Sequence, residues 1–176
     1  MRGIKIKATL LLGFIVFFSS CSRNNALFNI DTSACLTLVL GTPADRVFGF
    51  TQEVIFPFSV GLNNQNVSEE EIISVNGSMG LVFQKFRDEV NLNFINSITV
   101  DAIDPDDPTF SREVFFYEQF NFNQVNEIEL FPSLPNIKDF IRDDRLTLEI
   151  EFIFNTPPPR TFDLSFDLEF GALAME

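Results

Sequence analysis

Two segments near the C-terminus carry an apolar side chain at every second position, and this alternation constrains the fold more than any other feature. Residues 146–154 and residues 162–170 show the same pattern, with mostly polar or acidic residues between the apolar ones. A period of two indicates a β-strand with one buried face and one solvated face. Both segments are therefore predicted to be strands of one core. Their apolar residues are Leu146, Leu148, Ile150, Phe152, Phe154, Phe162, Leu164, Phe166, Leu168 and Phe170.

The connection between these two strands contains three consecutive prolines, Pro157–Pro159. Proline has no N–H group to donate to a sheet, so the prolines mark a turn rather than a strand. We expect the two strands to form an antiparallel hairpin. Their solvated faces would then combine into one acidic face without Lys or Arg inside either strand. The acidic residues of this face are Glu149, Glu151, Asp163, Asp167 and Glu169.

Shorter alternating or β-rich segments occupy most of the remaining chain. Asn76-Gly77 is a favourable turn pair between two of them. Residues 68–71 have the spacing of a capping box before a run that looks extended, and residues 136–142 favour a helical turn. Many short strands with few helices predict an all-β antiparallel β-sandwich, immunoglobulin-like, with eight or nine strands and at most one or two short helical turns. A closed barrel is the second choice. The additional strands are expected at residues 36–40, 53–60, 72–75, 80–86, 97–103, 113–120 and 127–131.

Several classes of function are excluded by composition. The 176 residues include no His, so a Ser-His-Asp triad and an imidazole metal site are impossible. With 25 acidic and 12 basic residues, the chain has no basic footprint for nucleic acid. There are 23 Phe but one Tyr and no Trp, and we interpret the Phe side chains as filling of the core.

The N-terminus has the organisation of a secretory signal peptide. Arg2, Lys5 and Lys7 precede an apolar run over residues 8–18. Eleven residues are too few to cross a bilayer as a helix, for which about 20 are needed. A basic start, a short apolar run and small residues after it are typical of a signal peptide. We therefore predict that residues 1–20 are removed on export.

The end of this segment resembles the lipobox of bacterial lipoproteins. The match is Phe18-Ser19-Ser20-Cys21, an apolar residue and two small residues before a cysteine. The resemblance implies that Cys21 is lipidated and becomes the mature N-terminus, and that the lipid attaches the protein to a membrane. Ser22 stands where an Asp would favour retention at the inner membrane, so the resemblance favours the outer membrane.

The mature chain is predicted to consist of a tether over residues 21–32 and one domain over residues 33–176. Three basic residues leave with the signal peptide, so nine remain against 25 acidic ones, a formal charge of −16. With Cys21 lipidated, Cys35 has no partner for a disulfide. It lies in an apolar run and is expected to be a buried small side chain, with a reactive thiol as the alternative.

One loop gathers carboxylates. Asp101, Asp104, Asp106 and Asp107 lie within seven residues, beside Pro105 and Pro108. Calcium takes six to eight oxygen ligands, and such a loop is a candidate site for it. The spacing lacks the central Gly and final Glu of an EF-hand, and Asp and Pro are also common in solvated turns. Calcium is the only cofactor that the sequence suggests.

The predicted function is that of a lipid-anchored lipoprotein of the cell envelope with a non-catalytic binding or structural β-domain. No nucleophile elbow, phosphate loop or metal motif is present, so we do not expect an enzyme. The acidic face is a candidate surface for an envelope or extracellular protein, although acidic residues also protect a sheet from aggregation. The alternatives are a calcium-dependent binder and a small carboxylate-based hydrolase. The pattern of strands and connections also resembles that of secreted β-sandwich lipoproteins, a likeness that implies no activity.

Overall fold

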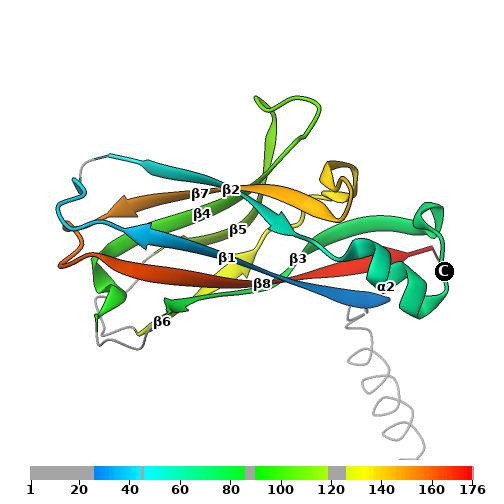
Figure 1. Cartoon of the computed structure of the whole chain (residues 1–176), viewed down its shortest axis with the longest axis horizontal. Coiled ribbons are helices and arrows are strands. Elements are labelled where there is room, and N and C mark those ends of the chain that lie inside the picture. Colours follow the sequence, from blue (N-terminus) through cyan, green and yellow to red (C-terminus); the bar gives the residue numbers. More distant parts are fainter. Residues whose placement is uncertain (1–25, 45, 86–89, 119–125, 176) are drawn as a thin grey trace, which may run out of the picture.

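Eight strands, one α-helix and three short 3₁₀ helices make up the described chain. The computed structural model describes residues 26–44, 46–85, 90–118 and 126–175 (Figure 1). The predicted signal peptide and Cys21 lie outside these residues. The elements are β1 (Phe28–Leu38), β2 (Phe48–Ile55), α2 (Phe58–Gln65), η1 (Glu69–Glu71), β3 (Ile72–Gln84), η2 (Leu92–Phe94), β4 (Ile95–Ile103), β5 (Ser111–Glu118), β6 (Glu127–Pro132), η3 (Lys138–Phe140), β7 (Arg145–Phe154) and β8 (Phe162–Ala174).

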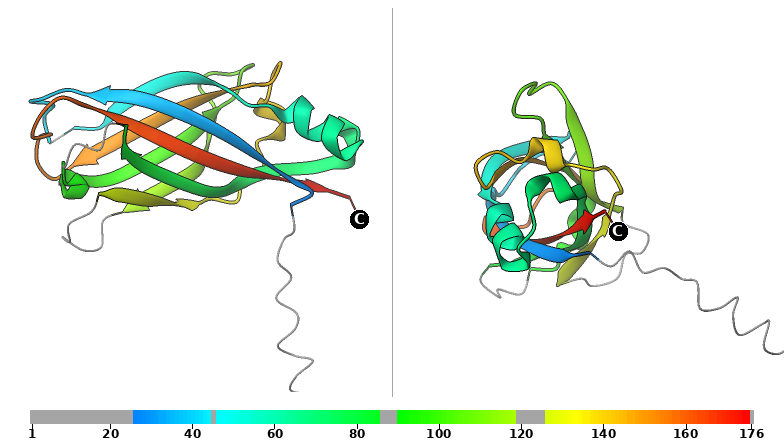
Figure 2. Two further views of the ribbon diagram at one scale, coloured as in Figure 1. Left: turned by 60° about the horizontal axis from the view of Figure 1, so that its bottom comes forward. Right: turned by 90° about the vertical axis from the view of Figure 1, so that its right-hand side faces the viewer.

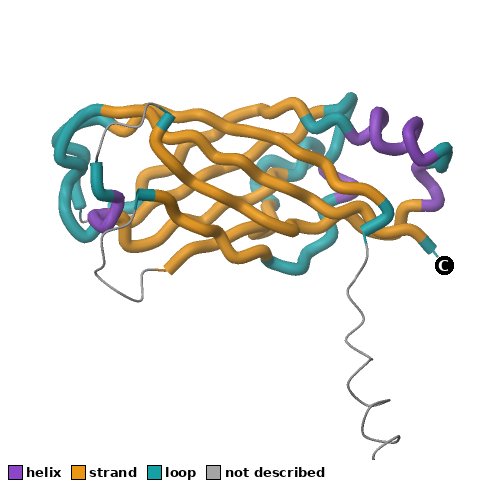
Figure 3. Tube along the Cα trace, turned by 90° about the horizontal axis from the view of Figure 1, so that it is seen from below, coloured by secondary structure: helices purple, strands orange, loops and turns teal. Residues whose placement is uncertain are grey.

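The eight strands form one antiparallel sheet that nearly closes on itself as a barrel-like wall (Figures 2 and 3). The strand order is β1-β8-β3-β6-β5-β4-β7-β2. The prediction of an all-β antiparallel fold is confirmed, but the sheet is not clearly an immunoglobulin-like sandwich. The reason lies in β6, which pairs with β3 on one side and with β5 on the other. Hydrogen bonding therefore continues around the wall where a sandwich would have two separate sheets.

The wall has two halves that meet along two different seams. Strands β1, β8, β3 and β6 form the first half, and β5, β4, β7 and β2 form the second. Two residue pairs join β5 to β6 in a short ladder. Strands β1 and β2 are joined by side chains instead. Thr32 Oγ1 donates to the carbonyl of Ile55 (2.7 Å), and the backbone N–H of Cys35 donates to Gln52 Oε1 (3.3 Å).

The predicted C-terminal hairpin is wrong. Strand β7 pairs with β2 and β4, whereas β8 pairs with β1 and β3. The two strands face each other across the core, where the rings of Phe152 and Phe166 meet edge to face at 6.1 Å. Alternation determines which side chains point inward, but not which strands are neighbours. The connection over residues 155–161 therefore crosses from one half to the other.

Phenylalanine fills the core, as the composition predicted. Phe56, Phe115 and Phe170 are fully buried, and the Phe170 ring lies edge-on to the other two at 5.1 and 5.2 Å. Leu, Ile and Val from all eight strands complete the same cluster. Buried apolar side chains of this kind each stabilise the fold by about 1.5–3 kcal/mol through the surface they remove from water.

The first strand begins earlier than the sequence analysis placed the domain. β1 starts at Phe28 and alternates strictly between buried and exposed residues, so residues 28–32 of the predicted tether belong to the sheet. This register places Cys35 on the outer face, where it is exposed and free. The expectation that Cys35 is buried is therefore wrong. Ala34 and Leu36 occupy the inward positions on either side of it.

Two local expectations also differ from the structure. Asn76-Gly77 lies inside the continuous strand β3, beside a register shift, and does not form a turn. A Cβ on Gly77 would lie 2.6 Å from the carbonyl oxygen of Val114, so glycine permits close approach of β3 to β5. The strand expected over residues 53–60 ends at Ile55, and α2 follows it.

Candidate functional sites

The predicted acidic face is divided between the two halves of the wall. Asp163, Asp167 and Glu169 lie on β8, whereas Glu149 and Glu151 lie on β7. On β8, the carboxylate of Asp163 accepts a hydrogen bond from Thr37 Oγ1 (2.6 Å). Glu169 Oε1 accepts one from Ser78 Oγ (3.0 Å), and Asp167 is exposed. Hydroxyl groups of neighbouring strands therefore solvate two of the three β8 carboxylates.

On β7 the carboxylates have other carboxylates as neighbours. The ladders place Glu149 opposite Asp101 of β4, and Asp101 opposite Glu113 of β5. Glu151 follows Glu149 on the same outer face. We call Asp101, Glu113, Glu149 and Glu151 the acidic row. The sequence suggested three of these residues for two separate sites, and it missed Glu113, which only the register of β4 and β5 brings alongside.

The acidic row is electrostatically unfavourable. Burial raises the pKa of Asp101 above its ordinary value, and the charges of Glu113 and Glu149 raise it further against a lowering hydrogen bond from Ser111. Burial likewise raises the pKa of Glu151, with Glu149 and Asp101 adding to the shift. Like charges on directly opposite residues of adjacent strands destabilise a sheet. Asp101 and Glu151 therefore hold their protons more tightly than isolated carboxylates do.

One oxygen of Asp101 stands out within the row. Its Oδ2 accepts a hydrogen bond from Ser111 Oγ (3.3 Å), whereas its Oδ1 is buried without a hydrogen-bond partner. The two salt bridges found in the described part of the chain, Arg142–Asp106 and Arg145–Glu53, do not involve the row. A cation or a basic side chain at this surface would relieve the repulsion.

The aspartate loop does not gather its carboxylates around one point. Asp104 Oδ1 accepts from the backbone N–H of Asp106 (2.8 Å), and Asp107 Oδ1 accepts from the N–H and hydroxyl of Thr109 (3.1 and 2.6 Å). These bonds lower the pKa of Asp107. The carboxylate of Asp106 pairs with Arg142 (2.8 Å). Each carboxylate has a local partner, the arrangement of a solvated turn. Among the residues that the structure describes, no group of three or more acidic or sulfur side chains is placed to hold a metal ion.

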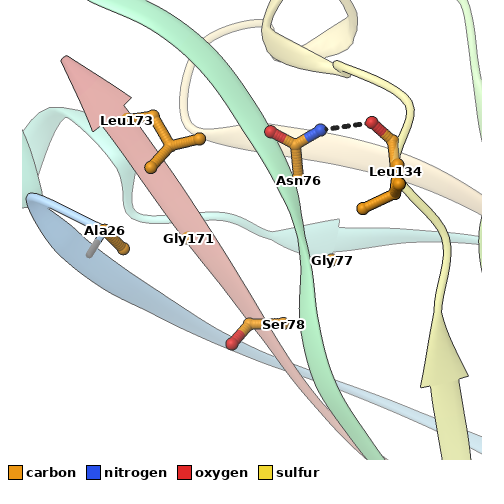
Figure 4. Close-up of a pocket in the computed structure, with 7 residues that line it drawn as sticks. All are labelled: Ala26, Asn76, Gly77, Ser78, Leu134, Gly171 and Leu173. Atoms are coloured by element: carbon orange, nitrogen blue, oxygen red, sulfur yellow. Dashed lines mark hydrogen bonds between the residues drawn. The ribbon is translucent and has the colours of Figure 1, made fainter. Parts of the chain in front are cut away.

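An open pocket of about 290 Å³ lies on the outer wall of the first half, near the start of β1 (Figure 4). Asn76 and Leu134 stand on one side of it, where Asn76 Nδ2 donates to the Leu134 carbonyl (2.6 Å). No ionisable side chain lines it, so it offers no acid–base pair for hydrolysis. The lining residues are Ala26, Asn76, Gly77, Ser78, Leu134, Gly171 and Leu173.

Comparison with known proteins assigns no family to this chain. No protein-family model matches it, and no curated protein matches it significantly. None of the helices among the described residues has the length and apolar character needed to cross a membrane. The functional argument therefore depends on the residues of this chain.

Proposed function

We propose that the protein is a lipid-anchored lipoprotein of the cell envelope whose β-domain is a non-catalytic binding module. The observation that carries the proposal is the segment Phe18-Ser19-Ser20-Cys21 after a basic start and a short apolar run. Strand β1 begins at Phe28, seven residues after this cysteine, so a single short segment separates the anchor from the domain. Acyl chains bound to Cys21 would supply the membrane affinity, at about 0.8 kcal/mol per buried CH₂ group.

The test of the anchor is mass spectrometry of the N-terminal peptide from protein purified out of membranes. We expect Cys21 to be the first residue and to carry acyl chains. Cys21→Ser is expected to leave the protein unlipidated and to move it out of the membrane fraction. The matched control is Cys35→Ser, since Cys35 is the only other cysteine of the chain. An unmodified Cys21 in the membrane-purified protein would refute the proposal. Separation of inner and outer membranes then tests the preference for the outer membrane.

The acidic row is the proposed binding surface, and its partner is a protein with a basic patch. The supporting observations are three adjoining strands of like charge and the raised pKa of Asp101, both of which a basic partner would relieve. The variant Glu149→Gln/Glu151→Gln should weaken cross-linking of the anchored protein to its partner, and added salt should do the same. Asp163→Asn/Asp167→Asn changes the same charge on the opposite half and serves as the control.

The alternative is a calcium-dependent binder, and one observation favours it. The buried Oδ1 of Asp101 has no hydrogen-bond partner, and carboxylate oxygens are the ligands that calcium prefers, so Asp101 would supply one ligand and water most of the others. Millimolar calcium would then raise the melting temperature, and Asp101→Asn would abolish the rise. If the aspartate loop were the site, Asp104→Asn would abolish it instead. An unchanged melting temperature would eliminate both sites. A carboxylate hydrolase has less support, because the row lies on the outer face of the sheet and the pocket has no carboxylate.

A further inference from the structure

The wall around the pocket is uncharged and partly apolar in a protein that is otherwise strongly acidic. Leu134 is 85% exposed, and Leu27, next to Ala26 at the start of β1, is 37% exposed. Gly171 and Leu173 of β8 continue this surface between them. We call these five residues the anchor wall. Exposed apolar side chains that gather around one pocket mark an interaction surface more often than scattered ones do.

The chain between the lipid and this wall is short. Ala26 is five positions after Cys21. A fully extended chain covers at most about 3.6 Å per residue, so Ala26 lies within about 18 Å of the lipidated cysteine. Strand β8 alone has 13 residues, and at about 3.3 Å per residue it is more than twice as long as this tether. The tether therefore keeps the start of β1, and with it the anchor wall, near the lipid surface.

Charge favours the same orientation. Strand β7 faces β8 across the core, so the β7 carboxylates of the acidic row point away from the anchor wall. The negative surface of a bilayer with anionic lipids repels carboxylates. Carboxylates border the wall on two sides: Glu169 of β8 lies opposite Asp31 of β1, and Glu113 of β5 accepts a hydrogen bond from Ser133 Oγ (2.7 Å), next to Leu134. Their carboxylates suit the cationic choline or ethanolamine groups of zwitterionic lipids.

We propose that the anchor wall rests on the headgroup layer of the membrane and that the β7 carboxylates of the acidic row, Glu149 and Glu151, face away from it. The inference rests on the proposed lipidation of Cys21 and adds the orientation of the domain. Burial of exposed leucines at the interface stabilises the contact, and the absence of ionisable side chains in the pocket avoids the cost of desolvating charge. The membrane then leaves Glu149 and Glu151 of the acidic row free for a partner.

The test places one fluorophore on each half of the full-length, lipidated protein. The background is Cys35→Ser, which removes the free thiol. Leu134→Cys places a label on the anchor wall, and Ile153→Cys places one on the outer face of β7. Both positions carry an exposed aliphatic side chain, at 85% and 40% exposure, so the pair is matched. The protein is bound to vesicles of phosphatidylcholine and phosphatidylethanolamine that contain a headgroup spin-labelled lipid, and quenching is measured at each position.

We expect severalfold stronger quenching at position 134 than at position 153. Equal quenching, or stronger quenching at 153, in protein that floats with the vesicles would overturn the orientation and leave the lipid anchor intact. Failure of the protein to float, together with an unmodified Cys21, would overturn the anchor and the orientation with it. A second pair, Leu173→Cys against Thr51→Cys, repeats the measurement at positions on β8 and β2, so that the result does not depend on one label.

Discussion

Strands β7 and β8 have nearly the same sequence pattern and opposite surroundings. Each turns apolar side chains into one core and acidic side chains outward. The β8 carboxylates of Asp163 and Glu169 accept hydrogen bonds from hydroxyl groups of β1 and β3. The β7 carboxylates of Glu149 and Glu151 adjoin other carboxylates, and the pKa of Glu151 is raised. The inner face of a strand thus follows from its own sequence, whereas the chemistry of its outer face depends on the strands beside it.

The largest expected effect comes from the buried faces of β7 and β8, which should contribute equally to the free energy of unfolding. Phe152→Ala on β7 and Phe166→Ala on β8 remove two fully buried rings that contact each other. Each is expected to lower the free energy of unfolding by about 3–5 kcal/mol, through lost burial and the cavity that remains. Urea unfolding of the variants checks this. A loss below about 1 kcal/mol for one of them would show that the two faces are not equivalent.

The second prediction addresses the outer face of the second half. Asp101→Asn removes the central charge of the acidic row and keeps an acceptor for Ser111. Because Asp101 stands opposite both Glu113 and Glu149, we expect the variant to be more stable at pH 7 by up to about 1 kcal/mol. Asp167→Asn on β8 is the control and should leave the stability nearly unchanged. Destabilisation by Asp101→Asn would indicate that a bound cation compensates the row.

The pH dependence sharpens the same comparison. The pKa of Asp101 is raised in the folded protein, so its ionisation costs more there than in the unfolded chain. The stability that its proton supplies is present below the pKa of an ordinary aspartate and is lost as the pH rises through the raised pKa. We expect the stabilising effect of Asp101→Asn to be larger at pH 7 than at pH 4. Unfolding curves of the wild type and variant across this range measure it, and a constant difference would contradict the raised pKa.

A smaller effect is expected on β8. Thr37→Val removes the hydroxyl that donates to Asp163 and keeps the shape of the side chain. The hydrogen bond is exposed, so its loss should cost about 0.5 kcal/mol in the free energy of unfolding. Thermal unfolding at pH 7 detects a change of this size. If Thr37→Val cost several kcal/mol, hydroxyl solvation of the β8 carboxylates would contribute far more than we infer.

The smallest expected effect is at Cys35, which is exposed in the structure and not buried as the sequence suggested. Its side chain lies on the outer face of β1, so Cys35→Ser should change the free energy of unfolding by less than about 0.5 kcal/mol. Reaction of the folded protein with a thiol reagent gives a second readout, and it should proceed without denaturant. Protection of the thiol until the protein unfolds would contradict the register of β1.

The sequence was sufficient for the inner faces of β7 and β8 because alternation is a local property. It was not sufficient to predict which strands pair with β7 and β8. A hairpin and a connection across the core both satisfy the apolar pattern and the prolines of residues 155–161. Residues 34–40 are mostly apolar, so they do not show which positions of β1 point into the core. The alternation of buried and exposed residues shows this when it is followed back to Phe28.

The acidic row shows the same limit. In the sequence, Asp101 belongs to the carboxylate-rich segment 101–107 and Glu149 to the alternating segment 146–154, and 48 positions separate them. Only the antiparallel ladder of β4 and β7, and the bulge between β4 and β5, bring Glu113 into line with both. Long-range register is set by tertiary packing, so a single sequence does not determine it.

The seam between β1 and β2 has a mechanical consequence. An anchor at Cys21 would transmit any pull on the domain into β1, the strand that borders this seam. Across it, the Thr32 hydroxyl donates to the Ile55 carbonyl and the Cys35 N–H donates to the Gln52 side chain, whereas the opposite edge of β1 has the full ladder with β8. Under load, the seam should part before the ladder shears, which would let the barrel-like wall yield locally while its phenylalanine core stays closed.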